Sequence, residues 1–294
     1  MQSLSANSAN SGAFPTPVVE PDWLAQHLED ANLVVVDCRF SLAEPEFGQQ
    51  QYAQGHIPGA FYLDLNQDLS SPVQGHGGRH PLPDQEKLTD KLRQLGINSK
   101  SPSGPTRVVA YDNSRFAFAS RLWWLLNYWG HSQVAVLNGG LAGWQSAGYG
   151  LSQVAPLPQA GNFSPQPQSG WTVEIEAVKQ CQNQPGVWLI DSRSPERYRG
   201  EQEPIDPIAG SIPGAVNYFW QEVSDPDGRL RSPAALHQHW QALAEAEKVI
   251  VYCGSGVTAC VNLLSQVAAG LPMQPLYVGG WSDWCSYLTS DSGA

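Results

Sequence analysis

One cysteine lies in a sequence context that could activate its thiol. Cys253 follows the apolar, β-branched run 248–252, which predicts a buried strand of a parallel sheet. Gly254 and Gly256 open the next turn, and residues 261–269 have the apolar spacing of a helix. A strand, a tight turn and a helix leave backbone N–H groups and a positive dipole end facing the thiol. This setting favours the thiolate and predicts a nucleophile; the alternative is an inert buried cysteine at a strand end.

Two other kinds of site can be built on such a loop, and the sequence argues against both. A phosphatase with a Cys-x5-Arg loop needs an arginine at the sixth position after the cysteine to hold the phosphoryl oxygens. That position is Ala259. A nucleotide-binding P-loop needs a lysine and a serine or threonine after its glycines, and neither pattern follows Cys253.

The segment that contains Cys253 belongs to a sequence that occurs twice. The strand-like run 33–36 and its Asp-Cys-Arg ending return as 187–190 and Asp-Ser-Arg. Three more segments recur in the same order: 55–60 as 210–215, 108–112 as 249–253, and 138–144 as 278–284. Four collinear matches at this length indicate a duplicated domain rather than a solenoid, whose units are far shorter.

The repeat divides the chain into parts. Residues 151–170 are rich in proline, glutamine and glycine and predict an extended linker between a domain at 17–150 and a domain at 171–294. Each half alternates short apolar strands with helical segments such as 121–128. The predicted fold class is therefore α/β, with a parallel sheet flanked by helices in each domain. Residues 1–16 lack the basic start and apolar core of a secretion signal and predict a disordered tail.

The duplication assigns the chemistry to one half. Where the second half has Cys253, the first half has Asp112. A carboxylate cannot act as a sulfur nucleophile, so the first domain is predicted to be inactive and to wall a cleft. Ligands of parallel sheets bind at the carboxyl ends of the strands, which is where Cys253 falls.

Composition limits the possible partners and the compartment. Of the 294 residues, 41% are hydrophobic and 15% are charged, as in a folded globular protein. The net charge of −11 argues against nucleic acid or an anionic membrane as a partner, so an anionic substrate needs a local cation. No apolar run is long enough to span a bilayer. Five widely spaced cysteines favour a reducing, cytoplasmic location, and no pair has zinc-ligand spacing, so no metal is expected.

Together these features resemble the tandem-domain rhodanese family of sulfurtransferases over residues 18–287. The most specific mark is the loop 253–258, Cys-Gly-Ser-Gly-Val-Thr, which is similar to that of the 3-mercaptopyruvate sulfurtransferases. Thiosulfate-preferring members tend to have basic residues directly after the cysteine. The resemblance implies an inactive first domain, an active second domain and a cleft between them.

The resemblance also implies a reaction. The Cys253 thiolate would attack the outer sulfur of 3-mercaptopyruvate or thiosulfate and become a persulfide. Backbone N–H groups of the loop would bind the negative sulfur; the residues are Gly254, Gly256, Val257 and Thr258, with Ser255 among them. A thiol, such as thioredoxin or a low-molecular-weight thiol, or cyanide would then remove the outer sulfur, with no cofactor or metal. The alternative is a non-catalytic regulatory or persulfide-carrier module with the same fold.

An anionic donor needs a cation that faces the cysteine. Residues 194–195, Ser-Pro, form a helix start that places Arg197 in the first turn. By the resemblance Arg197 matches a substrate-binding arginine; the alternative is a solvated surface arginine. Arg193 is expected to serve the structure, because its counterpart Arg39 lies in the half without the cysteine.

One position departs from the family pattern. Members that use mercaptopyruvate usually have a second arginine shortly after the first, in a Pro-Arg context. Here Pro204 is followed by Ile205. The missing cation leaves the preferred donor open.

The resemblance pairs Ser255 with a histidine and an aspartate of the first domain, and His80 and Asp64 match these positions. Such a relay could polarise the carbonyl of the donor or protonate the departing enolate, with Asp64 fixing the histidine tautomer. The alternatives are that Ser255 caps the helix and that His80 is an ordinary loop histidine. His76 lies in the same loop and could be mistaken for His80.

Overall fold

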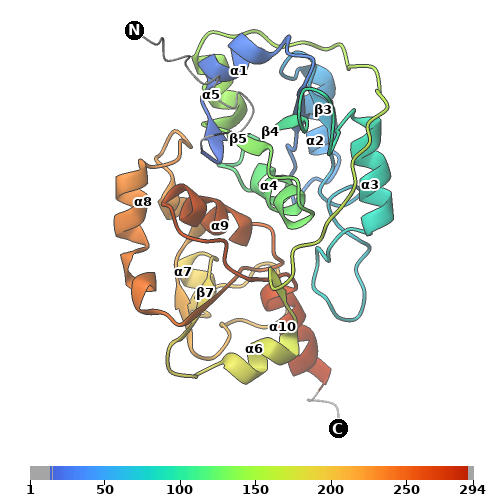
Figure 1. The fold of residues 1–294 in the computed structure, drawn as a ribbon. Helices are drawn as coiled ribbons and strands as arrows, with labels where there is room; N and C mark the ends of the chain where they lie inside the picture. The colour runs from blue at the N-terminus through green and yellow to red at the C-terminus, as the bar shows by residue number, and fades with distance from the viewer. Residues whose placement is uncertain (1–13, 15, 291–294) are drawn as a thin grey trace, which may run out of the picture.

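The computed structural model describes residue 14 and residues 16–290, and Figure 1 shows the chain as a ribbon. Most of the predicted disordered tail, residues 1–16, therefore lies outside the described residues. The ring of Phe14 packs edge-on against Trp23 at 5.3 Å between centroids. Among the described residues, no helix has the length and apolar character needed to cross a membrane.

The first half forms a parallel sheet of five strands in the order β1-β5-β4-β2-β3. The strands are β1 (Val18–Val19), β2 (Leu33–Asp37), β3 (Phe61–Tyr62), β4 (Arg107–Tyr111) and β5 (Val134–Leu137). The long strands are apolar and β-branched and are buried on both faces, as strands inside a parallel sheet are. The helices are α1 (Pro21–His27), α2 (Phe47–Gln54), α3 (Gln85–Gln94), α4 (Ala119–Tyr128) and α5 (Gly140–Ser146).

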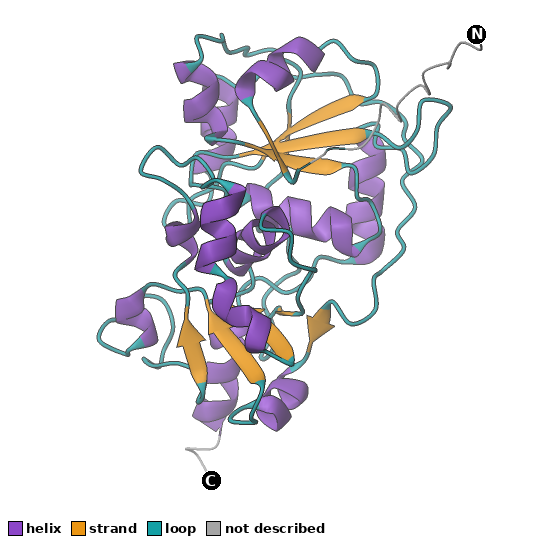
Figure 2. Cartoon of the chain, turned by 60° about the vertical axis from the view of Figure 1, so that its left-hand side comes forward, coloured by secondary structure: helices purple, strands orange, loops and turns teal. Residues whose placement is uncertain are grey.

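The second half repeats this architecture, with a parallel sheet in the equivalent order β6-β10-β9-β7-β8. Its strands are β6 (Thr172–Val173), β7 (Val187–Asp191), β8 (Ala215–Asn217), β9 (Lys248–Tyr252) and β10 (Leu276–Tyr277). Its helices are α6 (Ile175–Cys181), α7 (Pro195–Tyr198), α8 (Pro233–His239), α9 (Ala259–Ala268) and α10 (Gly280–Ser290), with 3-10 turns at Trp220–Val223 and Gln241–Glu245. Figure 2 shows helices around both sheets, so the predicted α/β fold class and the duplication are confirmed.

A buried ion pair recurs where β2 and β7 end. Arg39 donates to Asp37 at 2.6 Å, and Arg193 donates to Asp191 at 2.6 Å. Each arginine also donates to a glycine carbonyl of a following loop, at 2.7 and 2.6 Å. Buried charges need such complete pairing, since desolvating an ion pair is costly. The symmetry confirms that Arg193 holds structure in the same way as Arg39.

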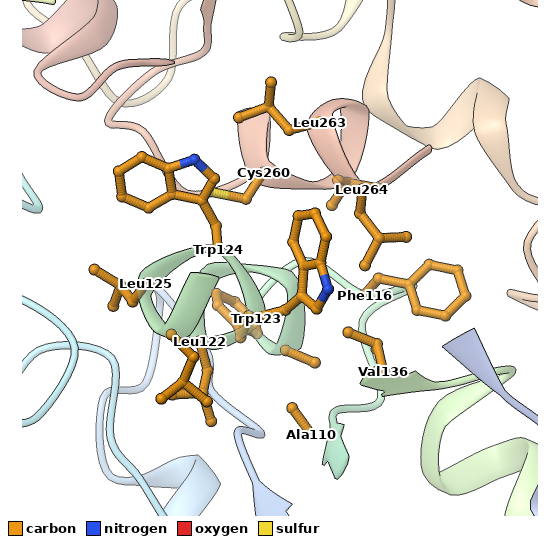
Figure 3. Packing of buried hydrophobic residues seen from close by; sticks show 14 of the residues in the cluster. Ala110, Phe116, Leu122, Trp123, Trp124, Leu125, Val136, Cys260, Leu263 and Leu264 are labelled. Atoms are coloured by element: carbon orange, nitrogen blue, oxygen red, sulfur yellow. The ribbon is translucent and has the colours of Figure 1, made fainter. Parts of the chain in front are cut away.

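The two domains meet through equivalent helices. Residues 119–126 of α4 and residues 259–266 of α9 are all buried. A helix that is buried all round lies in the interior of a protein, and here α4 and α9 lie against each other (Figure 3). Trp124 from α4 and Cys260, Leu263 and Leu264 from α9 belong to one apolar cluster that spans both halves.

The segment between the domains is extended and lies against the first domain. Ser152 forms an antiparallel bridge with His56, and Gln159 forms a parallel bridge with Leu95. Phe163 is fully buried. In Figure 1 this yellow-green segment passes α3 before it reaches β6 and α6 of the second domain.

The shared cluster predicts a stability effect. Leu264→Ala removes a side chain that is 0% exposed, so we expect the free energy of unfolding to fall by about 2–5 kcal/mol from lost burial and an unfilled cavity. Leu157→Ala, at a side chain that is 83% exposed, is the matched control and is expected to change little. Equilibrium unfolding in urea measures both. Equal, small effects would show that the interface is not tightly packed.

Candidate active site

Cys253 lies directly after β9, which is hydrogen-bonded on both sides, to β7 and to β10. The loop 254–258 follows, and α9 begins at Ala259. The predicted strand, turn and helix are therefore present. The cysteine is only 1% exposed, but it lines a cavity of about 500 Å³. The thiol is thus at the wall of an open site rather than enclosed in hydrocarbon.

The loop that follows Cys253 offers backbone hydrogen-bond donors. Among the described residues, no acceptor is hydrogen-bonded to the N–H groups of residues 254–258. Gly256 makes the loop possible, because its φ is +70° and a Cβ there would collide with the carbonyl of Val278. Free N–H groups before a helix form a site that suits a negative charge.

The equivalent loop of the first domain shows what such donors bind. The carboxylate of Asp112 accepts hydrogen bonds from four backbone N–H groups at 2.8–3.2 Å; the donors are Ser114, Phe116, Phe118 and Ala119. Burial is the larger effect, so the pKa of Asp112 is raised overall, although these four hydrogen bonds lower it. The first domain therefore holds its own carboxyl group in the position that the thiol occupies in the second domain.

Both domains line the cavity. Its wall includes Arg79, His80 and Phe118 from the first domain, and Arg197 and Trp220 from the second, beside the cysteine loop. The first domain therefore walls the cleft, as the duplication suggested.

Ser255 and His80 meet across the domain interface. The Nδ1 atom of His80 lies 2.7 Å from Oγ of Ser255, and both side chains are buried. Thr258 rather than Ser255 is the N-cap of α9, so the capping interpretation of Ser255 is wrong. His76 is bound elsewhere, with Nδ1 at 2.7 Å from Oγ of Ser286. The histidine at the site is therefore His80.

The environment of His80 keeps its ring neutral. Burial, together with the positive charges of Arg121 and Arg79, lowers the pKa of His80 to about 3. At neutral pH the ring therefore carries one proton, on either nitrogen. A neutral imidazole can accept the proton of the Ser255 hydroxyl. A doubly protonated ring cannot, because both of its nitrogens already carry a proton.

The expected contact between Asp64 and His80 is not present. The carboxylate of Asp64 accepts from the backbone N–H groups of Asn66 and Gln67 at 2.8 and 2.9 Å, and from the hydroxyl of Tyr62 at 3.3 Å. These bonds close the turn after β3, and none of the hydrogen bonds of Asp64 among the described residues reaches His80. The predicted three-residue relay is therefore corrected to a Ser255–His80 pair, because local amides satisfy the carboxylate.

Arg197 is a half-buried arginine of the cavity wall, with a side chain that is 16% exposed, rather than a solvated surface arginine. It lies in α7 and donates to Glu203 at 2.7 Å and to Asp206 at 2.9 Å. The side chains of the two carboxylates are only 3% and 2% exposed. Ile205, between them, is 44% exposed and also lines the cavity.

Two arginines of the first domain were not identified from the sequence. Arg121 is fully buried in α4 and donates to the carbonyls of Gly256 and His80, both at 3.1 Å, so it ties the cysteine loop to the histidine segment. The sequence contained a signal for Arg121, because a charged residue inside an otherwise apolar helix indicates a buried group that needs specific partners. Arg79 lies next to His80 and reaches into the cavity; its position beside the candidate histidine was the only hint.

Comparison with known proteins identifies the class. The rhodanese-like domain model matches residues 20–147 and again residues 174–287. A protein of Pseudomonas aeruginosa named "Probable 3-mercaptopyruvate sulfurtransferase" is 43% identical over 266 residues, which cover 89% of this chain and 92% of that protein. The thiosulfate sulfurtransferase of Rattus norvegicus is 29% identical over 280 residues, 91% of each chain.

The fold comparison agrees. The crystal structure of a 3-mercaptopyruvate sulfotransferase from Escherichia coli has a TM-score of 0.76 and 32% identity, and the match covers 91% of this chain and 99% of that one. The chain therefore belongs to the rhodanese-like family, with two copies of the domain in tandem, and it is a sulfurtransferase. This result favours an enzyme over the non-catalytic module.

The buried setting of His80 predicts its titration. The ring is expected to stay neutral down to pH 5, because its pKa is lowered to about 3. Two-dimensional NMR of the histidine rings measures this, and the signal of His80 is the one absent in His80→Gln. An apparent pKa near 6.5 would contradict the burial argument.

The same shift has a consequence for stability. An unfolded chain binds a proton at His80 below about pH 6.5, and the folded chain does not until about pH 3. The folded state therefore loses stability as pH falls through this window, by at most about 1.4 kcal/mol per pH unit from this group. In His80→Gln, urea unfolding between pH 6.5 and pH 5 is expected to depend less on pH than in the wild type.

Proposed function

We propose that this sulfurtransferase moves a sulfane sulfur from 3-mercaptopyruvate or thiosulfate, through a persulfide on Cys253, to a thiol or cyanide. The observation that carries the proposal is the placement of Cys253 at the wall of a cavity, beside unused backbone donors and arginines. The names of the relatives, which include both donors, support this choice of substrates.

The first half of the reaction balances with either donor. With thiosulfate, the thiolate attacks the outer sulfur, the S–S bond of the donor breaks, and sulfite leaves with the electron pair. With 3-mercaptopyruvate, the thiolate attacks the thiol sulfur, the C–S bond breaks, and the enolate of pyruvate leaves. The proton of the donor thiol ends on the carbon of that enolate. Both routes leave a persulfide on Cys253, a covalent intermediate that divides the transfer into two steps.

The loop is suited to stabilise the persulfide anion. The N–H groups of Gly254, Gly256, Val257 and Thr258 have no acceptor among the described residues. Preorganised donors of this kind stabilise charge that develops in the reaction without the cost of reorienting solvent. In the first domain the equivalent backbone donors bind the carboxyl group of Asp112, which supports this role for the loop.

The Ser255–His80 pair supplies a path for a proton. Its members lie 2.7 Å apart, and the neutral ring of His80 can exchange a proton with the hydroxyl. Only mercaptopyruvate needs a proton delivered to carbon, because sulfite leaves as a stable anion. The pair therefore has a task with one donor that it lacks with the other.

Arg197 would hold the anionic group of the donor. Its guanidinium lines the cavity, and Glu203 and Asp206 fix its orientation. An arginine fork that is fixed in this way binds carboxylate and sulfonate oxygens with defined geometry. This interaction exists before the chemistry begins, so it contributes to binding of the donor.

In the second half, an acceptor removes the outer sulfur. A thiolate acceptor, of thioredoxin or of a small thiol, attacks the outer sulfur, becomes a persulfide and restores the Cys253 thiolate. Cyanide attacks the same sulfur and leaves as thiocyanate. The proposed steps require no cofactor or metal. Within the described residues, no group of three or more His, Cys, Asp or Glu side chains could hold a metal ion. A cytoplasmic location, and the absence of nucleic-acid and membrane partners, stay predictions.

The persulfide is tested directly by mass. Incubation with thiosulfate or mercaptopyruvate, without an acceptor, is expected to add the mass of one sulfur atom to the intact chain. Cys253→Ser is expected to abolish this gain, because serine cannot carry a sulfane sulfur. Cys181→Ser, at a cysteine in α6 outside the cavity, is the matched control and should gain the sulfur normally. Undiminished transfer by Cys253→Ser would refute the mechanism.

The proton path is tested with the two donors side by side. His80→Ala is expected to lower kcat/KM with mercaptopyruvate about 100-fold, a typical contribution of general acid–base catalysis. Its effect with thiosulfate should be much smaller, because sulfite needs no proton on carbon. Steady-state kinetics with cyanide as the acceptor measures both. Equal losses with both donors would indicate that His80 only holds the loop.

A further inference from the structure

Arg121 is a buried charge to which the proposed steps give no task. The structure buries three arginines among the described residues, and two of them, Arg39 and Arg193, are paired with a carboxylate. Arg121 is 0% exposed, and no carboxylate lies within ion-pair distance of it in the part of the chain that the structure describes. An arginine keeps its proton in proteins, so this charge is permanent. A buried charge is costly unless another group compensates it.

The hydrogen bonds of Arg121 go to neutral groups. Its Nη1 atom donates to the carbonyl of Gly256 at 3.1 Å, and its Nη2 atom donates to the carbonyls of His80 and Pro81 at 3.1 and 3.4 Å. Its Nε atom is buried and has no hydrogen-bond partner among the described residues. Carbonyl oxygens satisfy N–H groups but bring no negative charge. These contacts therefore leave the charge of the guanidinium uncompensated.

Two sulfur atoms are the candidates for the compensating anion. Burial lowers the pKa of Arg121, while Cys260 and Cys253 raise it, so both thiols lie close enough to interact with its charge. The thiol of Cys260 donates to the carbonyl of Gly256 at 3.3 Å, and burial raises its pKa to about 12 although Arg121 lowers it. Cys260 is therefore a neutral thiol at neutral pH, and the ring of His80 is neutral as well. The sulfur that is left to carry a negative charge is that of Cys253.

Arg121 acts on this sulfur from the side of the loop that faces α4, not from the cavity. It is not among the residues that line the cavity, so it does not contact a donor there. Arg79 and Arg197 face the loop from the cavity, and the buried carboxylate of Asp206 pairs with both of them. Glu203 also pairs with Arg197. Carboxylates and solvent weaken the field of these two arginines, whereas a charge inside the protein is screened much less.

The contact with Gly256 aligns a peptide dipole with the charge of Arg121. The C=O and N–H of a trans peptide point in opposite directions, so a carbonyl that is held towards Arg121 turns the N–H of Val257 away from α4. The φ of +70° at Gly256 allows this orientation. Val257 lines the cavity, and its N–H has no acceptor among the described residues. The guanidinium and the peptide therefore act in the same direction on an anion at the loop.

The repeat provides an internal comparison for this position. Arg121 is the third residue of α4, and the third residue of the equivalent helix α9 is Val261. Both residues are buried. The fold therefore does not require a cation at this position, since the equivalent helix has an apolar residue there.

We propose that Arg121 is a positioning residue that supplies, from the first domain, the counter-charge for the anionic sulfur of Cys253, both as a thiolate and as a persulfide. The inference rests on the proposed function, because this anion is the nucleophile of that reaction. Arg121 lies outside the cavity, so it stabilises the sulfur without contacting the donor. Its effect is therefore the same for every donor, and it depends on the contact between the two domains.

The test is the pH dependence of the alkylation of Cys253 by iodoacetamide. Arg121→Gln keeps a donor for the carbonyl of Gly256 and removes the charge. The pH at which alkylation reaches half of its maximal rate is therefore expected to rise by about one unit. The part of the rate that disappears in Cys253→Ser belongs to this cysteine. Arg199→Gln is the matched control, because it removes the same charge from an exposed ion pair outside the cavity, and its midpoint is expected to stay at the wild-type value.

The rate of persulfide formation separates the charge from a merely structural role. One pH unit corresponds to about 10-fold in the fraction of thiolate. Below the wild-type midpoint, Arg121→Gln is therefore expected to form the persulfide about 10-fold more slowly, by the same factor with mercaptopyruvate and with thiosulfate. Above both midpoints the rate is expected to return to the wild-type value, because the sulfur is then ionised in both chains. A deficit that persists at this higher pH would show that Arg121 only holds the loop, and would overturn the proposal.

A second variant covers the case in which the glutamine variant folds poorly. Arg121→Met fills the buried site with an apolar chain, and the same rise of the midpoint is expected. An unchanged midpoint in the folded variants, in a chain that gains sulfur at Cys253, overturns the counter-charge and leaves the proposed function intact. A wild-type chain that gains no sulfur from either donor overturns the function itself.

Discussion

The packing of α4 against α9 is the constraint on which the rest of the structure depends. Both helices are buried all round, so neither domain can satisfy its own apolar surface alone. Their contact brings the segment of His80 over the loop of Cys253. The buried guanidinium of Arg121 donates hydrogen bonds to both of these segments, at the carbonyls of His80 and Gly256. The site is therefore a product of the interface: the second domain supplies the nucleophile, and the first supplies the histidine and a cavity wall.

The duplicated loop holds a different side chain in each half of the chain. In both domains a strand ends, a loop turns its N–H groups inward, and a buried helix follows. The first domain fills this site with the carboxylate of Asp112, which forms four hydrogen bonds there. The second domain has Cys253 in that place, and the N–H groups of residues 254–258 have no acceptor in the part of the chain that the structure describes. The two loops share one geometry and differ in the side chain that each presents to the backbone donors, a carboxyl group in the first domain and a thiol in the second.

Electrostatics at the cavity is balanced rather than strongly positive. Arg193 pairs with Asp191, and both Glu203 and Asp206 lie against Arg197. These buried carboxylates hold the arginines in fixed positions, which lowers the entropy lost when a donor binds. The overall charge of −11 does not attract an anionic donor, so the local arrangement of cations must do so. The neutral ring of His80 fits this picture, since a further positive charge there would be costly.

The sequence by itself determined the duplicated α/β fold and the strand–loop–helix around Cys253, because periodicity, turn residues and internal repeats can be read along the chain. The inactivity of the first half stays a prediction. The resemblance also indicated the pair of Ser255 and His80. Only the tertiary structure decided the partners of Asp64, which local amides satisfy, and the reach of Arg79 and Arg121 into the other domain. The physical reason is that a long, flexible side chain takes its position from the surfaces packed around it. Those surfaces come from segments far apart in the chain, and no local pattern specifies how they meet.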